Sequence, residues 1–364
     1  MTITKDSVKG ITGRTKLNDI EAILDIPEVD PNDISHIVKT NADSIFTWDY
    51  SSSKPQIHKL YEKAKLGQWN GNDLPWDTSV DIEKVVAEEE ANLGLRVSID
   101  MYDNTPISKW GQKEWLEYGI ESRRWVLSQT LHGEQGAMIC ASKIVETVPW
   151  WDAKLYAATQ VVDEARHAEV FNRYITEKMG DVYPVNWHAR KLLDHIVGDS
   201  RWDMTYLGMQ VMLEGLALAS FGHMYHMSSE PLLKQLLRQV MIDESRHIAF
   251  GVLSLKDAYE NMTDAEIKDR QEFAYEACIY IHDRIYQYEV FENMGVKPKD
   301  IIPILIKDPV NVFIHRLSLA KIVPSCKNLG LLDRNNGWLR NRFEELGIIS
   351  FEDQNAGDIY PGGE

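Results

Sequence analysis

A five-residue pattern, Asp-Glu-x-Arg-His, occurs twice in this chain, at 163–167 and, eighty residues later, at 243–247. In each copy the glutamate is preceded, thirty residues upstream, by another glutamate. On a helix, Glu and His three residues apart share one face. A single Glu-x-x-His often arises by chance, but chance does not account for two copies with the same upstream glutamate. The two equivalent sets are Glu134, Glu164 and His167, and Glu214, Glu244 and His247.

The interval between the two glutamates of each set has a turn signal at its midpoint, Pro149 in the first set and Ser229 in the second. A helix of fifteen residues rises about 22 Å, and an antiparallel partner of equal length returns to the same height. Each pair of glutamates would therefore meet at one level of a helical hairpin. Two facing hairpins, joined by a long connection from 180 to about 201, form an all-α four-helix bundle.

The six side chains supply carboxylates and imidazoles but no thiolate, a donor set that suits iron or manganese better than copper. We expect a dinuclear centre, most often di-iron, with manganese or a mixed Fe/Mn pair as alternatives. The first set would hold one metal and the second set the other, with one or two glutamates bridging the pair. The same six residues are therefore the candidate catalytic residues.

Two further residues of each motif are expected to support the ligands. Asp163 and Asp243 each stand four residues before a ligand histidine, and a carboxylate there can accept the imidazole N–H that faces away from the metal. Arg166 and Arg246 are expected to pair with these aspartates, because a buried cluster of acids needs compensating positive charge.

Composition restricts the partners and the compartment. A net charge of −17 and the lack of a basic run argue against nucleic acid. No apolar stretch reaches the length of a membrane span, and three scattered cysteines suggest no disulfide framework. We expect a cytoplasmic protein with no membrane partner. The pattern divides the chain into an irregular N-terminal arm packing on the bundle (1–80), the helical bundle (81–295), and a C-terminal helical appendage with a loose tail (296–364).

The paired motifs resemble the ferritin-like di-iron carboxylate superfamily, which includes ribonucleotide reductase small subunits, bacterial monooxygenase hydroxylases and arylamine N-oxygenases. The resemblance covers 134–247 by motif and 81–295 by helical pattern, and a segment at 60–77 is similar to one preceding the bundle in bacterial members. No subfamily is matched completely. Phe171 replaces the tyrosine of radical-storing reductase subunits. Ala137 and Met209 replace the cross-linked Val and Tyr of related ligand-binding oxidases. Val240 replaces the third histidine of arylamine N-oxygenases, and Leu218 replaces a threonine common in bacterial hydroxylases.

Residues one turn from the ligands are nearly all apolar and form a candidate substrate pocket, although the same positions could simply pack the bundle core. Gln160 and Gln210 are the polar candidates for positioning a substrate, or for a hydrogen bond within the core. The predicted pocket comprises Leu131, Ala137, Met138, Ala141, Phe171, Gln210, Leu218 and Phe221.

The resemblance implies an O2-dependent, monooxygenase-type oxidoreductase acting on a small organic substrate by hydroxylation, N-oxygenation or desaturation. It would act through a peroxo-diferric or high-valent intermediate. Since the chain has no flavin, NAD or iron–sulfur motif, an external donor such as a ferredoxin or flavin reductase is expected, and a homodimer through the outer helices is expected too. A radical-generating reductase-like subunit, a ferroxidase and a manganese catalase are the alternatives.

Overall fold

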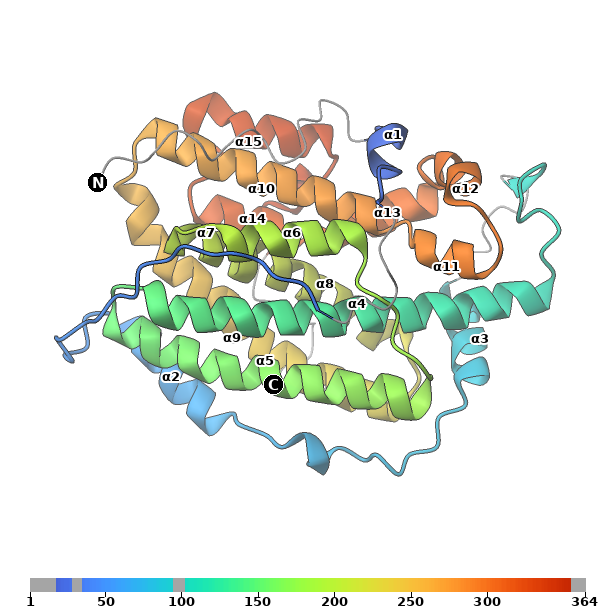
Figure 1. Ribbon diagram of the computed structural model, residues 1–364, viewed down its shortest axis with the longest axis horizontal. Coiled ribbons are helices and arrows are strands. Elements are labelled where there is room, and N and C mark those ends of the chain that lie inside the picture. Colours follow the sequence, from blue (N-terminus) through green and yellow to red (C-terminus); the bar gives the residue numbers. More distant parts are fainter. Residues whose placement is uncertain (1–17, 28–34, 94–101, 355–364) are drawn as a thin grey trace.

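The computed structural model describes residues 18–27, 35–93 and 102–354, and within these ranges the regular structure is entirely helical. The expected all-α fold is therefore confirmed. Figure 1 shows long helices lying roughly along the longest axis of the molecule, with shorter helices covering one side. Residues 1–17 and 28–34 of the predicted N-terminal arm, 94–101 of the predicted bundle and 355–364 of the predicted C-terminal tail lie outside the described residues.

Four long segments form the bundle. The first hairpin joins α4 (Gln112–Thr147) to α5 (Trp151–Lys178), which lie side by side in Figure 1. The second joins α8 (Glu214–Met227) to α9 (Pro231–Glu260). Both predicted turns are confirmed. Pro149 follows the end of α4, because a proline disfavours helical backbone at the residue before it. Pro231 is the first residue of α9, a position where the missing N–H of proline costs nothing.

The helix that contains α8 starts before Glu214, and its backbone is distorted just ahead of this predicted ligand. It begins as α7 (Trp202–Tyr206), continues as a π-helical segment, η3 (Leu207–Leu213), and enters α8 with helical backbone angles at both junctions. Helix α9 packs very closely against η3 at Gly251. A Cβ added to Gly251 would lie 2.3 Å from Cβ of Gln210. Such π-helical segments are rare and occur frequently at functional sites. Here the segment ends immediately before Glu214.

Residues 35–80 lie against the bundle and include a regular helix, α2 (Pro55–Leu66), where an irregular arm was expected. Pro55 at the first helical position and a run of good helix formers behind it explain why this helix forms. It packs across α5 and α9. Behind it, Gly71 permits a close approach, since a Cβ there would lie 2.6 Å from Val170.

The remaining helices cover the bundle. They are α1 (Ile20–Ile23), α3 (Ile82–Leu93), α6 (Trp187–Gly198), α10 (Asp264–Arg284), α11 (Tyr288–Asn293), α12 (Pro298–Leu305), α13 (Pro309–Ser318), α14 (Ile322–Asn328) and α15 (Arg334–Glu345). The connection from 180 to 201 contains α6, which packs on α4 and α10. Helices α14 and α15 bury Val323, Leu339 and Phe343 in the same apolar cluster as α10, so this part of the 296–364 segment shares the main core.

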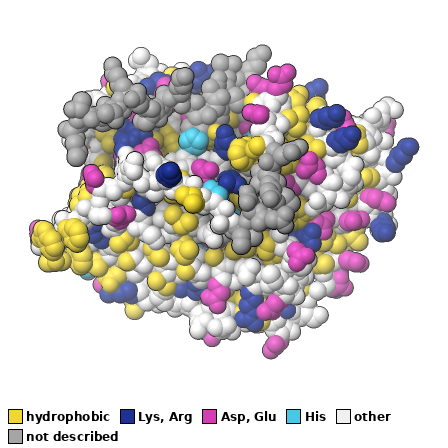
Figure 2. All heavy atoms as spheres, viewed as in Figure 1, with side chains coloured by type: hydrophobic (Ala, Val, Ile, Leu, Met, Phe, Trp, Pro, Cys, Tyr) yellow, Lys and Arg dark blue, Asp and Glu magenta, His cyan; other side chains and the backbone are white. Residues whose placement is uncertain are grey.

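The surface carries both signs of charge. On the face shown in Figure 2, Lys and Arg side chains are scattered among Asp and Glu rather than gathered into a patch. Within the described residues, no helix is long and apolar enough to cross a membrane.

Candidate metal centre

The structure brings together all six predicted ligand side chains in the middle of the bundle. Glu134 comes from α4, Glu164 and His167 from α5, Glu214 from the start of α8, and Glu244 and His247 from α9. Each is at least 96% buried. Burial of four carboxylates and two imidazoles in one place is costly unless they are paired or coordinate metal ions.

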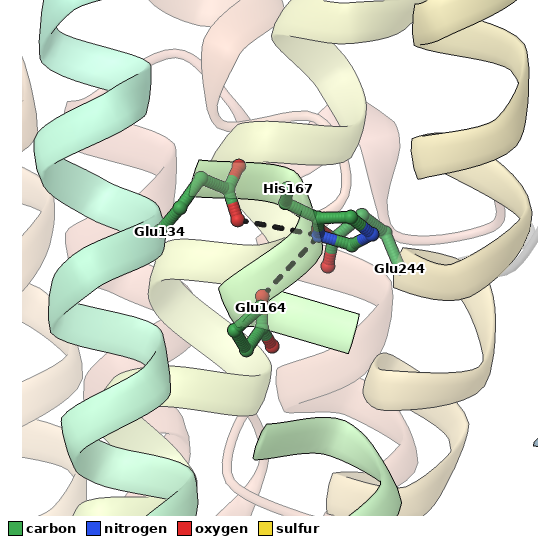
Figure 3. A group of neighbouring side chains, drawn as sticks. All are labelled: Glu134, Glu164, His167 and Glu244. Carbon is green, nitrogen blue, oxygen red and sulfur yellow. Dashed lines mark ion pairs between the residues drawn. The ribbon is translucent and has the colours of Figure 1, made fainter. Parts of the chain in front are cut away.

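The six residues form two overlapping groups, each with ligand atoms within 4.8 Å of one another. One group is Glu134, Glu164, His167 and Glu244, shown in Figure 3, and the other is Glu164, Glu214, Glu244 and His247. Glu164 and Glu244 therefore belong to both. The sequence predicted that Glu134 and Glu214 belong to different metals, and in the structure they belong to different groups.

Both histidines point the same ring nitrogen at the carboxylates. Nδ1 of His167 lies 3.4 Å from Glu134, 3.4 Å from Glu164 and 3.2 Å from Glu244. Nδ1 of His247 lies 3.2 Å from Glu164 and 3.1 Å from Glu244. In Figure 3 the carboxylates of Glu134 and Glu164 both reach toward the His167 ring. A metal placed among these atoms would meet imidazole and carboxylate donors together.

Several potential ligand atoms of the cluster make no hydrogen bond. Oε2 of Glu164, Oε1 of Glu244 and Nδ1 of His167 are buried and accept or donate no hydrogen bond among the described residues. Orphaned buried acceptors of this kind are rare in proteins and require an explanation such as an ion. Two divalent cations would satisfy these atoms and balance the negative charge, so the cluster fits a dinuclear metal site.

The ionisation of the cluster agrees with this interpretation. Burial raises the pKa of Glu134 to about 8 and that of Glu214 well above its usual value. Burial alone would lower the pKa of His247, but the surrounding carboxylates raise it to about 10. Without metal, the site therefore retains protons, and metal binding would release them.

Comparison with known proteins identifies the architecture. No protein-family model matches the chain, and no curated protein matches it. Among solved structures, the chain is similar to an R2-like ligand-binding oxidase with a non-activated Mn/Mn cofactor, at 15% sequence identity and a TM-score of 0.50, covering 77% of this chain and 94% of that one. A structure of an R2-like ligand-binding oxidase with a Mn/Fe cofactor gives 14% identity with the same TM-score and coverage. The chain has the ferritin-like fold.

Within this ferritin-like bundle, the motif aspartates hold the far side of the two imidazoles. Nε2 of His167 lies 3.0 Å from Oδ2 of Asp243, and Nε2 of His247 lies 3.4 Å from Oδ2 of Asp163. The pairs are crossed, because each aspartate serves the histidine of the other hairpin rather than the one four residues along its own helix. A proton on Nε2 leaves the Nδ1 lone pair free for a metal.

The motif arginines close this network. Arg166 donates to Asp163 at 2.6 Å and to Asp243 at 3.1 Å. Arg246 pairs with Asp243 on its own helix and lies 3.7 Å from Asp163. With the histidines and arginines around them, both aspartates have lowered pKa values despite their burial, so they remain ionised.

Two residues of the N-terminal segment reach this network, and neither was predicted to have such a role. Nε1 of Trp69 donates to Asp243 Oδ2 at 2.8 Å, and Gln68 donates to Asp163 Oδ1 at 2.8 Å. The guanidinium of Arg166 also lies over the Trp69 ring, 4.7 Å from its centroid. The similarity of 60–77 to a segment preceding ferritin-like bundles was the one available signal, since nothing in its spacing points to the ligands.

Gln160 and Gln210 form a hydrogen-bonded pair beside the metal ligands. Nε2 of Gln160 donates to Glu164 at 2.8 Å and lies 3.2 Å from Glu214, while Gln210 donates to Oε1 of Gln160 at 2.7 Å. Oε1 of Gln210 is buried without a hydrogen-bond partner in the described chain. The two amides therefore hold the carboxylates of different hairpins in register and leave one acceptor open.

The other predicted pocket residues have different surroundings. Phe171, Leu218 and Phe221 are buried in one apolar cluster, with Leu131 packed against it, and the Phe171 and Phe221 rings stack at 5.5 Å. Ala137 and Ala141 are fully buried, and Met138 is only half-buried. That these side chains contact a substrate stays a prediction.

Proposed function

We propose that the protein is a dinuclear non-haem metal oxidoreductase that uses dioxygen to oxidise a small organic substrate. The observation that carries the proposal is the sharing of Glu164 and Glu244 between the two ligand groups. Shared carboxylates hold two ions close enough to act on one molecule. When bound, a redox-active pair, of iron or of manganese and iron, supplies the electrons that dioxygen needs. The Mn/Fe cofactor of the similar R2-like oxidase supports this choice.

The protein groups have distinct roles in this proposal. Glu164 and Glu244, which belong to both groups, would be shared by the two ions. Glu134 with His167, and Glu214 with His247, would complete the two sets. Asp243 and Asp163 fix the orientation of the imidazoles through Nε2. Oε2 of Glu164 and Oε1 of Glu244 accept no hydrogen bond, so both oxygens would be available to an ion.

Two further features favour oxidation of an organic molecule over iron storage. The buried apolar cluster around Phe171, Leu218 and Phe221 excludes water from one side of the centre, which protects reactive species from side reactions. On another side, the amide of Gln160 donates to both Glu164 and Glu214 and so positions two of the carboxylates that would hold the ions. Insertion of one oxygen atom into the substrate is the reaction that this setting supports best.

Electrons must enter from outside, and the surroundings of Trp69 provide a route. The half-buried indole is joined to His167 through Asp243 by contacts of 2.8 and 3.0 Å. We propose that an external one-electron donor, such as a ferredoxin or a flavin reductase, docks near this tryptophan. The acidic character of the chain favours a donor whose contact surface carries lysines or arginines.

The test is reconstitution with iron(II) under anaerobic conditions, followed by measurement of dioxygen uptake with candidate aryl, acyl and alkyl substrates. Uptake coupled to incorporation of 18O from labelled dioxygen into a substrate is the expected result. Uptake without any organic product would indicate a ferroxidase, and evolution of dioxygen from peroxide would indicate a catalase. Either of these outcomes would overturn the oxygenase proposal.

A further inference from the structure

A cavity lies apart from the metal cluster, between α3, α4 and α8. Its volume is about 210 Å³. Among the residues that line it, Val126 precedes Glu134 by eight positions on α4, a separation of about 12 Å along a helix. The stacked rings of Phe171 and Phe221 belong to the apolar cluster against which Met224, another lining residue, is packed. The cavity is thus separate from the six ligands.

The walls of this cavity are largely apolar. Val86 of α3, Val126 of α4, and Met224 and Met227 of α8 supply them. An apolar cavity of about 150 Å³ is large enough to hold benzene, so a ring with one substituent fits the space available here. Methionine side chains adapt their shape to a ligand more readily than branched ones do.

One ion pair gives the cavity its polar character. Nη1 of Arg123 contacts Oε2 of Glu89, and Nη2 of Arg123 donates to Ser228 Oγ at 3.0 Å. The second Glu89 oxygen, Oε1, and the Nε–H of Arg123 are both buried and lack a hydrogen-bond partner within the described residues. The Arg123 side chain is only 9% exposed. Glu89 and Arg123 both line the cavity, so the charged part of its wall is this one ion pair.

The chemistry of this pair selects the head group of a ligand. Glu89 neutralises Arg123, so a carboxylate ligand would be repelled by Glu89 and an ammonium ligand by Arg123. A neutral group that both donates and accepts hydrogen bonds meets neither repulsion and can pair with both members of the ion pair. His223, which also lines the cavity, adds no charge near neutral pH because burial lowers its pKa.

We propose that this cavity binds a small molecule with an aromatic or compact apolar body and a neutral donor–acceptor head group, such as a primary amide or a hydroxyl. The site does not depend on the proposed oxygenase function, because it contains none of the six ligands. Glu89 and Arg123 are its specificity-determining pair.

Benzamide and benzoate test this proposal because they have almost the same shape and differ in the head group. Binding to the full-length protein is followed by NMR of 13C-methyl-labelled methionine, in which Met224 and Met227 report on the cavity and Met209 on the vicinity of the metal ligands. We expect benzamide to shift Met224 and Met227 and to bind at least tenfold more tightly than benzoate. Val126→Phe, which fills the cavity, is expected to abolish these shifts.

Two variants of neighbouring glutamates make the test specific. Glu89→Gln leaves Arg123 uncompensated, so benzoate is expected to become the tighter ligand. Glu88→Gln is the matched control, because Glu88 contacts Ser229 at 2.6 Å and does not line the cavity, and it should keep the original preference. Equal affinity for both ligands in wild type and Glu89→Gln, or benzamide shifts that survive Val126→Phe, would overturn the proposal.

Discussion

Asp243 on α9 accepts a hydrogen bond from Nε2 of His167 on α5, with a nitrogen–oxygen distance of 3.0 Å. The reciprocal contact, from His247 to Asp163, is longer at 3.4 Å. These crossed contacts tie the two hairpins together directly behind the metal ligands. The same Asp243 oxygen also accepts from Trp69 and Arg166, so the aspartate links the N-terminal segment to the site.

Asp243→Asn is expected to lower the affinity for metal. An asparagine keeps the size of the side chain but removes the charge that fixes the His167 tautomer, and loss of such a partner costs about 10–100-fold in affinity. Asp163→Asn is the matched change at the looser contact and should have the smaller effect. Anaerobic titration with iron(II) measures both. Equal affinities for wild type and both variants would show that the crossed contacts do not support the ligands.

Arg246→Met is expected to destabilise the fold strongly. Its guanidinium pairs with Asp243 and lies near Asp163, and removal of one partner from a buried pair costs about 3–5 kcal/mol of unfolding free energy. Lys84→Met is a suitable control, since its pair with Glu88 is exposed and should be worth less than about 1 kcal/mol. Urea denaturation of the metal-free proteins measures the difference. Similar losses in both variants would contradict the predicted importance of the buried network.

Gly251→Ala is expected to disturb the π-helical segment before Glu214. The new Cβ would overlap the Gln210 side chain, and overpacking of a core typically costs about 1–3 kcal/mol. At Gly133, by contrast, an added Cβ meets nothing within 4 Å, so Gly133→Ala should raise stability by about 0.5–1 kcal/mol. Thermal unfolding distinguishes these opposite signs. A stabilising Gly251→Ala change would mean that η3 and α9 are not held at close contact.

Trp69→Phe is expected to slow reduction of the oxidised metal centre while leaving its metal content unchanged. Phenylalanine keeps an apolar ring beside Arg166 but cannot donate to Asp243, which breaks the hydrogen-bonded route to His167. Stopped-flow reduction by a small one-electron donor measures the rate. Trp76→Phe is the control, because the Trp76 indole donates to the Gly71 carbonyl and not to the metal network. Equal rates in all three proteins would rule out Trp69 as the electron entry point.

The sequence predicted the parts of the site that depend on spacing within one hairpin. Glu134 and Glu164 converge because equal helical lengths flank Pro149, and one-turn spacing brings His167 to the same face. The crossed aspartates could not be predicted in this way, because their partners depend on how one hairpin is rotated against the other. Trp69 was missed for a related reason, since α2 and the segment after it reach the site only through tertiary packing.

We propose that the six ligand side chains bind two metal ions that react with dioxygen. Anaerobic iron(II) titration followed by exposure to dioxygen tests this, with iron bound and dioxygen consumed counted per chain. We predict two iron ions per chain and rapid dioxygen uptake in the wild-type protein, both lost in the Glu164→Ala, Glu244→Ala double variant. One iron ion or none per chain, or uptake that persists in the double variant, would contradict the account.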